Sequence, residues 1–121
     1  MSIISIVALL IGVFLLIEGV WVEFSDVVFG VLTTNRIRAT IHILLGLVGV
    51  LTALKGGARS FLIFGGLIIA LVGALWLLPP TNPLMVNILA VNQPVAILNI
   101  IVGSVALLVA FLGNRANNSN A

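Results

Sequence analysis

Four long apolar runs most constrain what this chain can fold into. They cover residues 3–22, 39–54, 60–78 and 94–112, and the only charged side chain inside them is Glu18. A helix needs about 20 mostly apolar residues to cross the roughly 30 Å hydrocarbon core of a bilayer. Charged residues make up 7% of the chain, against about 25% in soluble domains. The sequence therefore predicts an all-α integral membrane protein, a bundle of four transmembrane helices with the lipid bilayer as its partner.

The rest of the composition argues against several kinds of chemistry. Without cysteine, the chain offers no disulfide and no thiolate for a metal or for catalysis. Its single histidine, His42, would supply one ligand to a metal or haem, which is too few for a site. The net charge of +2 comes from scattered residues that form no basic face for nucleic acid. No phosphate-binding loop and no pair of nucleophile and base is recognisable. We therefore expect no enzymatic activity, no cofactor, no metal and no nucleic-acid partner.

The basic residues indicate an orientation. With four spans, both termini and the middle loop lie on one side of the membrane. That side holds Lys55, Arg59 and Arg115, and the other side holds Arg36 and Arg38. Because cytoplasmic loops carry an excess of Lys and Arg, this favours both termini in the cytoplasm, in the cytoplasmic (inner) membrane of a prokaryote. The first run has no preceding Lys or Arg and no small-residue cleavage site after it, so we interpret it as a retained span.

The second and fourth runs repeat one pattern at a shift of 57 residues. Both read Asn-x6-[His/Asn]-x3-Gly-x2-[Gly/Ala]-x3-Ala, a polar head followed by a stripe of small residues on one helix face. The stripe consists of Gly46, Gly49 and Ala53 in the second run and of Gly103, Ala106 and Ala110 in the fourth. Because small residues let helices approach closely in lipid, we expect the second and fourth helices to make the closest internal contact.

The first and third runs also agree, at a shift of 54 residues, which predicts a duplicated two-helix unit. Its copies are residues 1–54 and 55–112, arranged as parallel repeats about an approximate two-fold axis along the membrane normal. A single transmembrane domain then comprises residues 1–112, and residues 113–121 form a polar disordered tail.

Two asparagines mark helix starts. Asn35 and Asn92 each precede an apolar run, where a side-chain oxygen can accept an unpaired N–H of the first turn. The segments before them, residues 25–32 and 84–91, are apolar for loops, and we expect them to lie at the membrane interface. The prolines within residues 79–83 should end the third helix.

These motifs resemble a known family. The Asn-x6-His-x3-Gly head of the second run, its Asn-x6-Asn-x3-Gly counterpart in the fourth and the Gly-Gly-Ala-Arg turn between the halves are similar to the DUF4383 family of small four-helix membrane proteins. The resemblance covers about residues 30–103 and implies a fold and a membrane location but no reaction. In that family a histidine tends to end each head, often with His or Asp four positions earlier. Here the first copy has His42 preceded by Arg38. The second has Asn99 preceded by Val95, so half of any histidine pair is missing.

Glu18, His42 and Asn99 are the candidate functional residues. With the termini inside, all three fall in one layer near the outer leaflet, because they lie within about one to two turns of the outer helix ends. Ionisable groups within a span are costly and mark candidate functional sites. The layer could bind a proton, with Glu18 partly protonated through desolvation and His42 as its partner. Alternatively, it is a hydrogen-bonded tier that fixes the packing of the bundle, or Glu18 reaches the interface.

Four further residues lie at the outer boundary. Trp21 and Trp76 close the first and third runs, as in an aromatic belt. Arg36 and Arg38 could attract anionic headgroups, with Glu23 and Asp26 close enough to neutralise them.

Two functions are consistent with these features. The first is a small structural or accessory membrane protein that associates with itself as a homo-oligomer or with a larger complex, since one charged residue in four spans leaves no lined aqueous path. The alternative is a protomer of an oligomeric transporter or channel that binds a proton or small solute at Glu18, His42 and Asn99.

Overall fold

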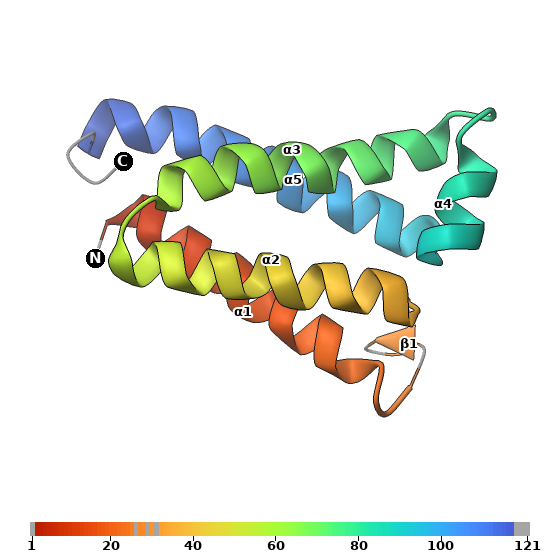
Figure 1. Ribbon diagram of the computed structural model, residues 1–121. Coiled ribbons are helices and arrows are strands. Elements are labelled where there is room, and N and C mark those ends of the chain that lie inside the picture. Colours follow the sequence, from red (N-terminus) through yellow and green to blue (C-terminus); the bar gives the residue numbers. More distant parts are fainter. Residues whose placement is uncertain (1, 26, 29, 31, 118–121) are drawn as a thin grey trace.

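The computed structural model describes residues 2–25, 27, 28, 30 and 32–117. Its elements, in chain order, are α1 (Ile3–Trp21), β1 (Val27–Val28), β2 (Leu32–Thr33), α2 (Arg36–Lys55), α3 (Ala58–Leu77), α4 (Asn82–Leu89) and α5 (Gln93–Asn117) (Figure 1). Helices α1, α2, α3 and α5 are long and apolar enough to cross a membrane. The predicted all-α bundle of four membrane-spanning helices is confirmed.

The four long helices form two antiparallel hairpins. Helix α1 packs with α2 and α3 packs with α5, and these two pairs share the most extensive contacts in the structure (Figure 1). A tight turn at Gly56 and Gly57 joins the hairpins, and both residues have positive φ angles, 114° and 94°, which glycine adopts without steric cost. The start of α1, this turn and the end of α5 lie at one end of the bundle, which we call the terminal end. The strands and α4 lie at the opposite end, which we call the far end.

The first glycine of each small-residue stripe, Gly46 on α2 and Gly103 on α5, packs inside its own hairpin. A Cβ atom added at Gly46 would lie 2.7 Å from the Gly12 carbonyl oxygen of α1. One added at Gly103 would lie 2.5 Å from the Gly66 carbonyl oxygen of α3. The expectation that α2 and α5 make the closest contact is therefore wrong. The closer partner is the preceding long helix, because Gly12 and Gly66 offer equally small surfaces and consecutive elements are usually neighbours in space.

The buried positions of the two hairpins correspond. On α1 and α3 they match at the shift of 54 residues, in the pairs Ile4/Ala58, Ala8/Leu62, Gly12/Gly66, Leu15/Ile69 and Gly19/Gly73. On α2 and α5 they match at the shift of 57 residues, in the pairs Arg38/Val95, Ala39/Ala96, His42/Asn99, Gly46/Gly103, Gly49/Ala106 and Ala53/Ala110. Each hairpin therefore turns the same helix faces inward, which is the arrangement that a parallel duplication requires.

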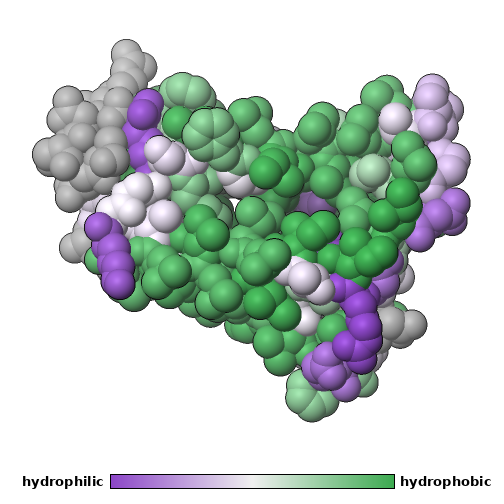
Figure 2. Space-filling model, in the orientation of Figure 1, coloured by the Kyte–Doolittle hydropathy of each residue, from purple (hydrophilic) through white to green (hydrophobic). Residues whose placement is uncertain are grey.

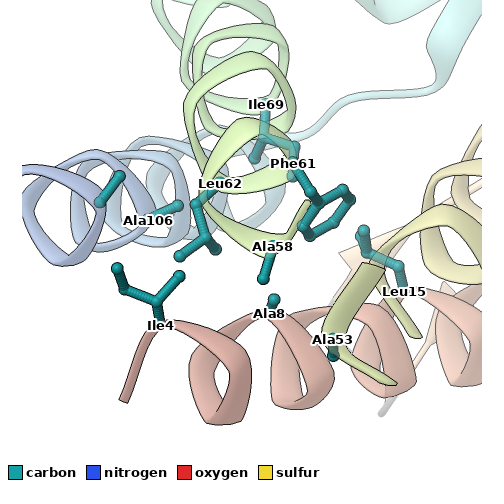
Figure 3. Close-up of a cluster of buried hydrophobic side chains, with 10 residues drawn as sticks. Ile4, Ala8, Leu15, Ala53, Ala58, Phe61, Leu62, Ile69 and Ala106 are labelled. Atoms are coloured by element: carbon teal, nitrogen blue, oxygen red, sulfur yellow. The ribbon is translucent and has the colours of Figure 1, made fainter. Parts of the chain in front are cut away.

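A cluster of buried apolar side chains joins the two hairpins (Figure 3). We call it the terminal cluster, and it consists of Ile4, Ala8, Leu15, Ala53, Ala58, Phe61, Leu62, Ile69, Ala106 and Ala110. In Figure 3, Ile4 of α1 points toward Leu62 of α3, and Ala8 points toward Ala58. Large and small side chains thus interdigitate between the hairpins, which is how helices pack where lipid replaces water.

The far end differs from the two loops predicted there. Residues 82–89 form the short helix α4, which runs across the end of the bundle (Figure 1), and β1 pairs antiparallel with β2. Pro83 favours this helix because the first turn does not use its missing N–H. A second group, the far cluster, consists of Leu32, Val91, Val95 and Ala96, with Trp21 and Trp76 packed against it. Both tryptophans are thus at the expected end of their helices but partly covered by protein.

Two helix ends bear on the predicted boundaries. Helix α3 ends at Leu77, two residues before Pro79, as expected. Helix α5 continues to Asn117, so residues 113–117 of the predicted disordered tail are helical. That segment contains no proline to stop the helix. The rest of the predicted tail, residues 118–121, lies outside the described residues.

We predict that Gly46→Ala and Gly103→Ala each lower the free energy of unfolding by about 1–3 kcal/mol, as at other overpacked sites. The new methyl group would meet backbone atoms that have no rotamer to move to. Gly65→Ala is the matched control, since its Cβ would lie 3.4 Å from the nearest atom, on the Phe61 ring. Equilibrium unfolding in detergent micelles measures the three values. If Gly65→Ala lowered the free energy of unfolding as much as the other two substitutions, the close backbone contact at Gly46 and Gly103 would be contradicted.

Candidate functional site

A buried ion pair joins α1 and α2 near the far end. Glu18 of α1 is 4% exposed, and Arg38, in the first turn of α2, is 2% exposed. Arg38 Nη2 donates a hydrogen bond to Glu18 Oε2 at 3.1 Å, and Arg38 Nη1 donates to the backbone carbonyl of Thr33. The expectation that Arg38 faces lipid headgroups is therefore wrong. The buried carboxylate opposite Arg38 makes the interior of the bundle the favourable place for its charge.

His42 lies beside this ion pair, and we call Glu18, Arg38 and His42 the polar tier. His42 follows Arg38 by four residues, so both side chains occupy one face of α2. The Nδ1 atom of His42 lies 3.7 Å from Glu18 Oε2. This distance exceeds a normal hydrogen bond. The imidazole therefore contacts the carboxylate without a hydrogen bond in this arrangement.

Asn99 is buried at the equivalent position of the second hairpin. It lies on α5 and is 8% exposed. Among the described residues, the charged or ionisable partners of Glu18 are Arg38 and His42. The structure thus places Glu18 and His42 together, records no bond between Glu18 and Asn99, and adds Arg38 to the group.

Two sequence signals pointed to Arg38. Its spacing of four from His42 places it on the same helix face as His42, and the shift of 57 aligns it with Val95, an apolar residue of the fourth run. Both signals were outweighed by its charge and its place at the start of a span, which are typical of interfacial arginines.

The two asparagines act as helix caps. Asn35 Oδ1 accepts a hydrogen bond from the Arg38 backbone N–H at 2.9 Å, and Asn92 Oδ1 accepts one from the Val95 N–H at 3.0 Å. Asn35 Nδ2 also donates to the Ile88 carbonyl at the end of α4, at 2.8 Å. The cap at Asn35 therefore fixes where α2 begins and places Arg38 in its first turn, opposite Glu18.

Arg36 takes the surface position that both arginines were expected to hold. Its Nη1 pairs with Glu23 Oε1 at 2.9 Å, and the two side chains are 76% and 59% exposed. An exposed pair of this kind contributes about 0–1 kcal/mol. The pair neutralises charge at the surface, as the sequence suggested for Glu23, while Asp26 lies outside the described residues. Among the described residues, the buried pair is the principal electrostatic feature.

The polar tier has unused hydrogen-bonding capacity. Arg38 Nε and His42 Nδ1 are buried and have no hydrogen-bond partner among the described residues. A carboxylate and an imidazole are groups that can take up a proton. Within the part of the chain that the structure describes, no three His, Cys, Asp or Glu residues are grouped so as to hold a metal ion. The tier can therefore fix the hairpin and hold a proton, but it does not resemble a metal centre.

The second hairpin has an uncharged version of the same tier, in which Asn99 takes the place of His42. Val72 occupies the position of Glu18 on α3, and Val95 occupies the position of Arg38 on α5. Val95 belongs to the far cluster, and Val72 packs against it. The same hairpin geometry thus accommodates either an ion pair or two valines.

We predict that Glu18→Val and Arg38→Val each lower the free energy of unfolding by about 3–5 kcal/mol, because each leaves an unpaired partner inside the bundle. The loss should be larger for Glu18→Val, since a carboxyl group can be neutralised by a proton and a guanidinium cannot. The double variant, which copies the second hairpin, should recover to within about 2 kcal/mol of the unchanged protein.

A matched cycle on Glu23→Ala and Arg36→Ala, measured by the same unfolding assay, is the control. The exposed pair should show a coupling below about 1 kcal/mol. A double Glu18→Val, Arg38→Val variant no more stable than the worse single variant would refute the equivalence of the two tiers.

The comparisons with known proteins identify a family. The family model described as a domain of unknown function, DUF4383, matches residues 23–112, which include Arg38, His42 and Asn99. Neither the curated proteins nor the solved structures contain a match to this chain. The match confirms the resemblance seen in the sequence motifs. Since it spans well over half of the chain, this protein belongs to the DUF4383 family.

Proposed function

We propose that this protein is a small structural or accessory membrane protein, not an enzyme, that associates with copies of itself or with a larger membrane complex. The observation that supports this role is that the charged groups of the polar tier are buried inside the bundle and paired there. Its two opposite charges are paired with each other, so the tier brings no net charge into the bilayer when both groups are ionised. The family description adds no activity.

The surroundings of the polar tier also favour a structural role. Between the tier and the terminal end, the buried core consists of the terminal cluster, whose members are all alanine, leucine, isoleucine or phenylalanine. An ion or proton pathway needs polar side chains, exposed backbone or water along its length. Among the described residues, this cluster supplies no polar side chain to continue a path from the tier.

The outer surface of the bundle fits contact with lipid and with other helices. Apolar side chains cover the visible face of the long helices (Figure 2). Strongly exposed examples occur on each span, such as Leu10, Leu44, Phe64 and Leu108. Such a surface is stable in hydrocarbon and offers broad faces for association.

We further propose that the two hairpins, residues 1–54 and 55–112, are copies of one unit. The matching buried positions support this duplication. The second copy has no charged residue from residue 60 to its end at residue 112, so the fold of the unit does not need an ion pair. The Glu18–Arg38 ion pair of the first copy then makes this hairpin chemically different from the second one.

The orientation we propose places both termini in the cytoplasm of a prokaryotic cell, with the protein in the inner membrane. Arg38 is buried, so of the two far-end arginines only Arg36 reaches the surface. The terminal end carries Lys55 and Arg59 beside the turn between hairpins. Because basic residues near span ends favour the cytoplasmic side, burial of Arg38 strengthens the bias toward termini inside.

The absence of cysteine allows the orientation to be tested with single introduced thiols. A membrane-impermeant maleimide should label Asn87→Cys, on the exposed surface of α4, in intact cells. Ser60→Cys, at the terminal end, should be labelled only after the cells are permeabilised. The reverse pattern would show that the termini lie outside.

A second candidate function is a proton or small-solute site within an oligomeric transporter or channel. The unpartnered Nδ1 of His42 beside the Glu18 carboxylate favours it. In this case, neighbouring copies would have to complete the pathway that one bundle lacks.

Proteoliposomes with an imposed pH gradient and an internal pH-sensitive dye separate the two candidates. For a structural role, the gradient should decay at the rate of empty liposomes. Rapid decay that His42→Asn abolishes would favour the transporter instead, since asparagine is the residue of the second hairpin at that position. Cross-linking in native membranes, followed by purification, should in the structural case recover a second copy or a larger complex.

A further inference from the structure

A groove opens between the two hairpins on the far half of the bundle. Phe14 of α1, Leu32 of β2 and one face of α5 line it, and its volume is about 710 Å³. Toward the terminal end, α1 and α5 meet closely, since a Cβ added at Gly113 would lie 2.9 Å from the Ile4 side chain. The seam between α1 and α5 is therefore closed at the terminal end and open at the far half.

The occupant of this groove has to come from the bilayer. Its long walls belong to α1 and α5, two of the membrane-spanning helices. Ile97 and Ile101, on the α5 wall, are 48% and 54% exposed. At this depth the surrounding medium is hydrocarbon, which excludes soluble ligands and water as occupants of an apolar groove.

The lining of the groove is polar at one end and apolar along the rest of its length, which suits an amphiphilic molecule. Gln93, the first residue of α5, supplies the polar side chain of the groove, and the other lining residues are apolar. Ile101 lies eight residues further along α5, which is about 12 Å deeper in the membrane. The volume and the single polar group match the general pattern of ligand sites, which are apolar clefts of roughly 300–1,000 Å³ with a few orienting polar groups.

The opposite seam, between α2 and α3, carries a smaller apolar groove of about 330 Å³ with a different lining. At the shift of 57 residues, Gln93 corresponds to Arg36, whose side chain pairs with Glu23. Ile97 corresponds to Thr40, whose hydroxyl donates to the Arg36 carbonyl. The apolar groove with a neutral amide at its mouth is thus a property of the α5 side.

We propose that this groove is a binding site for one phospholipid from the leaflet at the far end. One acyl chain lies along Ile97 and Ile101 against Phe14, and the headgroup region is hydrogen-bonded by the Gln93 amide. This site does not depend on either function proposed above, because it rests on the groove and its depth in the membrane.

Native mass spectrometry of the full chain, released from nanodiscs of phosphatidylethanolamine and phosphatidylglycerol, tests the proposal. The unchanged protein should retain one phospholipid per chain. Ile101→Trp, which fills the groove, should lose that lipid. Leu44→Trp is the matched control at the equivalent position of α2, with a similar exposure of 59%, and it should retain the lipid.

A second pair of variants, Ile97→Trp and Thr40→Trp, applies the same comparison if Ile101→Trp fails to fold by circular dichroism. The proposal would be overturned if the unchanged protein retained no phospholipid. It would also be overturned if the α2 and α5 variants lost the phospholipid to the same extent. A dimer that dissociates only in the α5 variants would also overturn it, because a second copy would then occupy the groove.

Discussion

The close backbone contact of glycines within each hairpin is the constraint on which the rest of the structure depends. Gly46 faces Gly12, and further along the same antiparallel pair Gly19 approaches Ala39, where an added Cβ would lie 2.9 Å from the Ala39 carbonyl oxygen. These contacts fix how far α1 is shifted along α2. With that register, Glu18 falls at the level between Arg38 and His42, so one carboxylate can contact both. The position of the Glu18–Arg38 ion pair therefore follows from steric packing, because the glycine contacts set the register of α1 against α2.

The two hairpins have different residues at equivalent positions of the same helix pair. The first buries an ion pair where the second has the partly buried Val72 and the buried Val95. Buried ion pairs are often no more stabilising than apolar residues of similar size, but losing one partner is costly. We expect the charged tier to add specificity to the first hairpin, since an ionised Glu18 carboxylate that missed Arg38 would be left unpaired inside the bundle. The Thr33 carbonyl and the Asn35 amide extend this specificity to α4, because the segment that holds Arg38 is also bonded to Ile88 of the second hairpin.

Much of this arrangement could be predicted from sequence, for identifiable physical reasons. The spans follow from hydrocarbon thickness, the caps at Asn35 and Asn92 follow from unpaired N–H groups, and the inward faces follow from the two shifts. Arg38 was missed because a charge near a helix end has two stable environments, the headgroups and a buried counter-ion, and local sequence does not distinguish them. The partner of each small-residue stripe was missed because a stripe shows that a helix can approach closely but not which helix it meets. The helix α4 was missed because eight residues without charge carry little periodicity.

Solid-state NMR on the protein in lipid bilayers would test the buried ion pair most directly. It would record the dipolar coupling of the labelled Arg38 guanidinium nitrogens to the labelled Glu18 carboxyl carbon and to the phosphorus of the lipid headgroups. We predict a clear coupling to Glu18, consistent with the 3.1 Å hydrogen bond between Arg38 Nη2 and Glu18 Oε2, and none to phosphorus. Coupling to headgroup phosphorus with no coupling to Glu18 would place Arg38 at the membrane surface and contradict the buried polar tier.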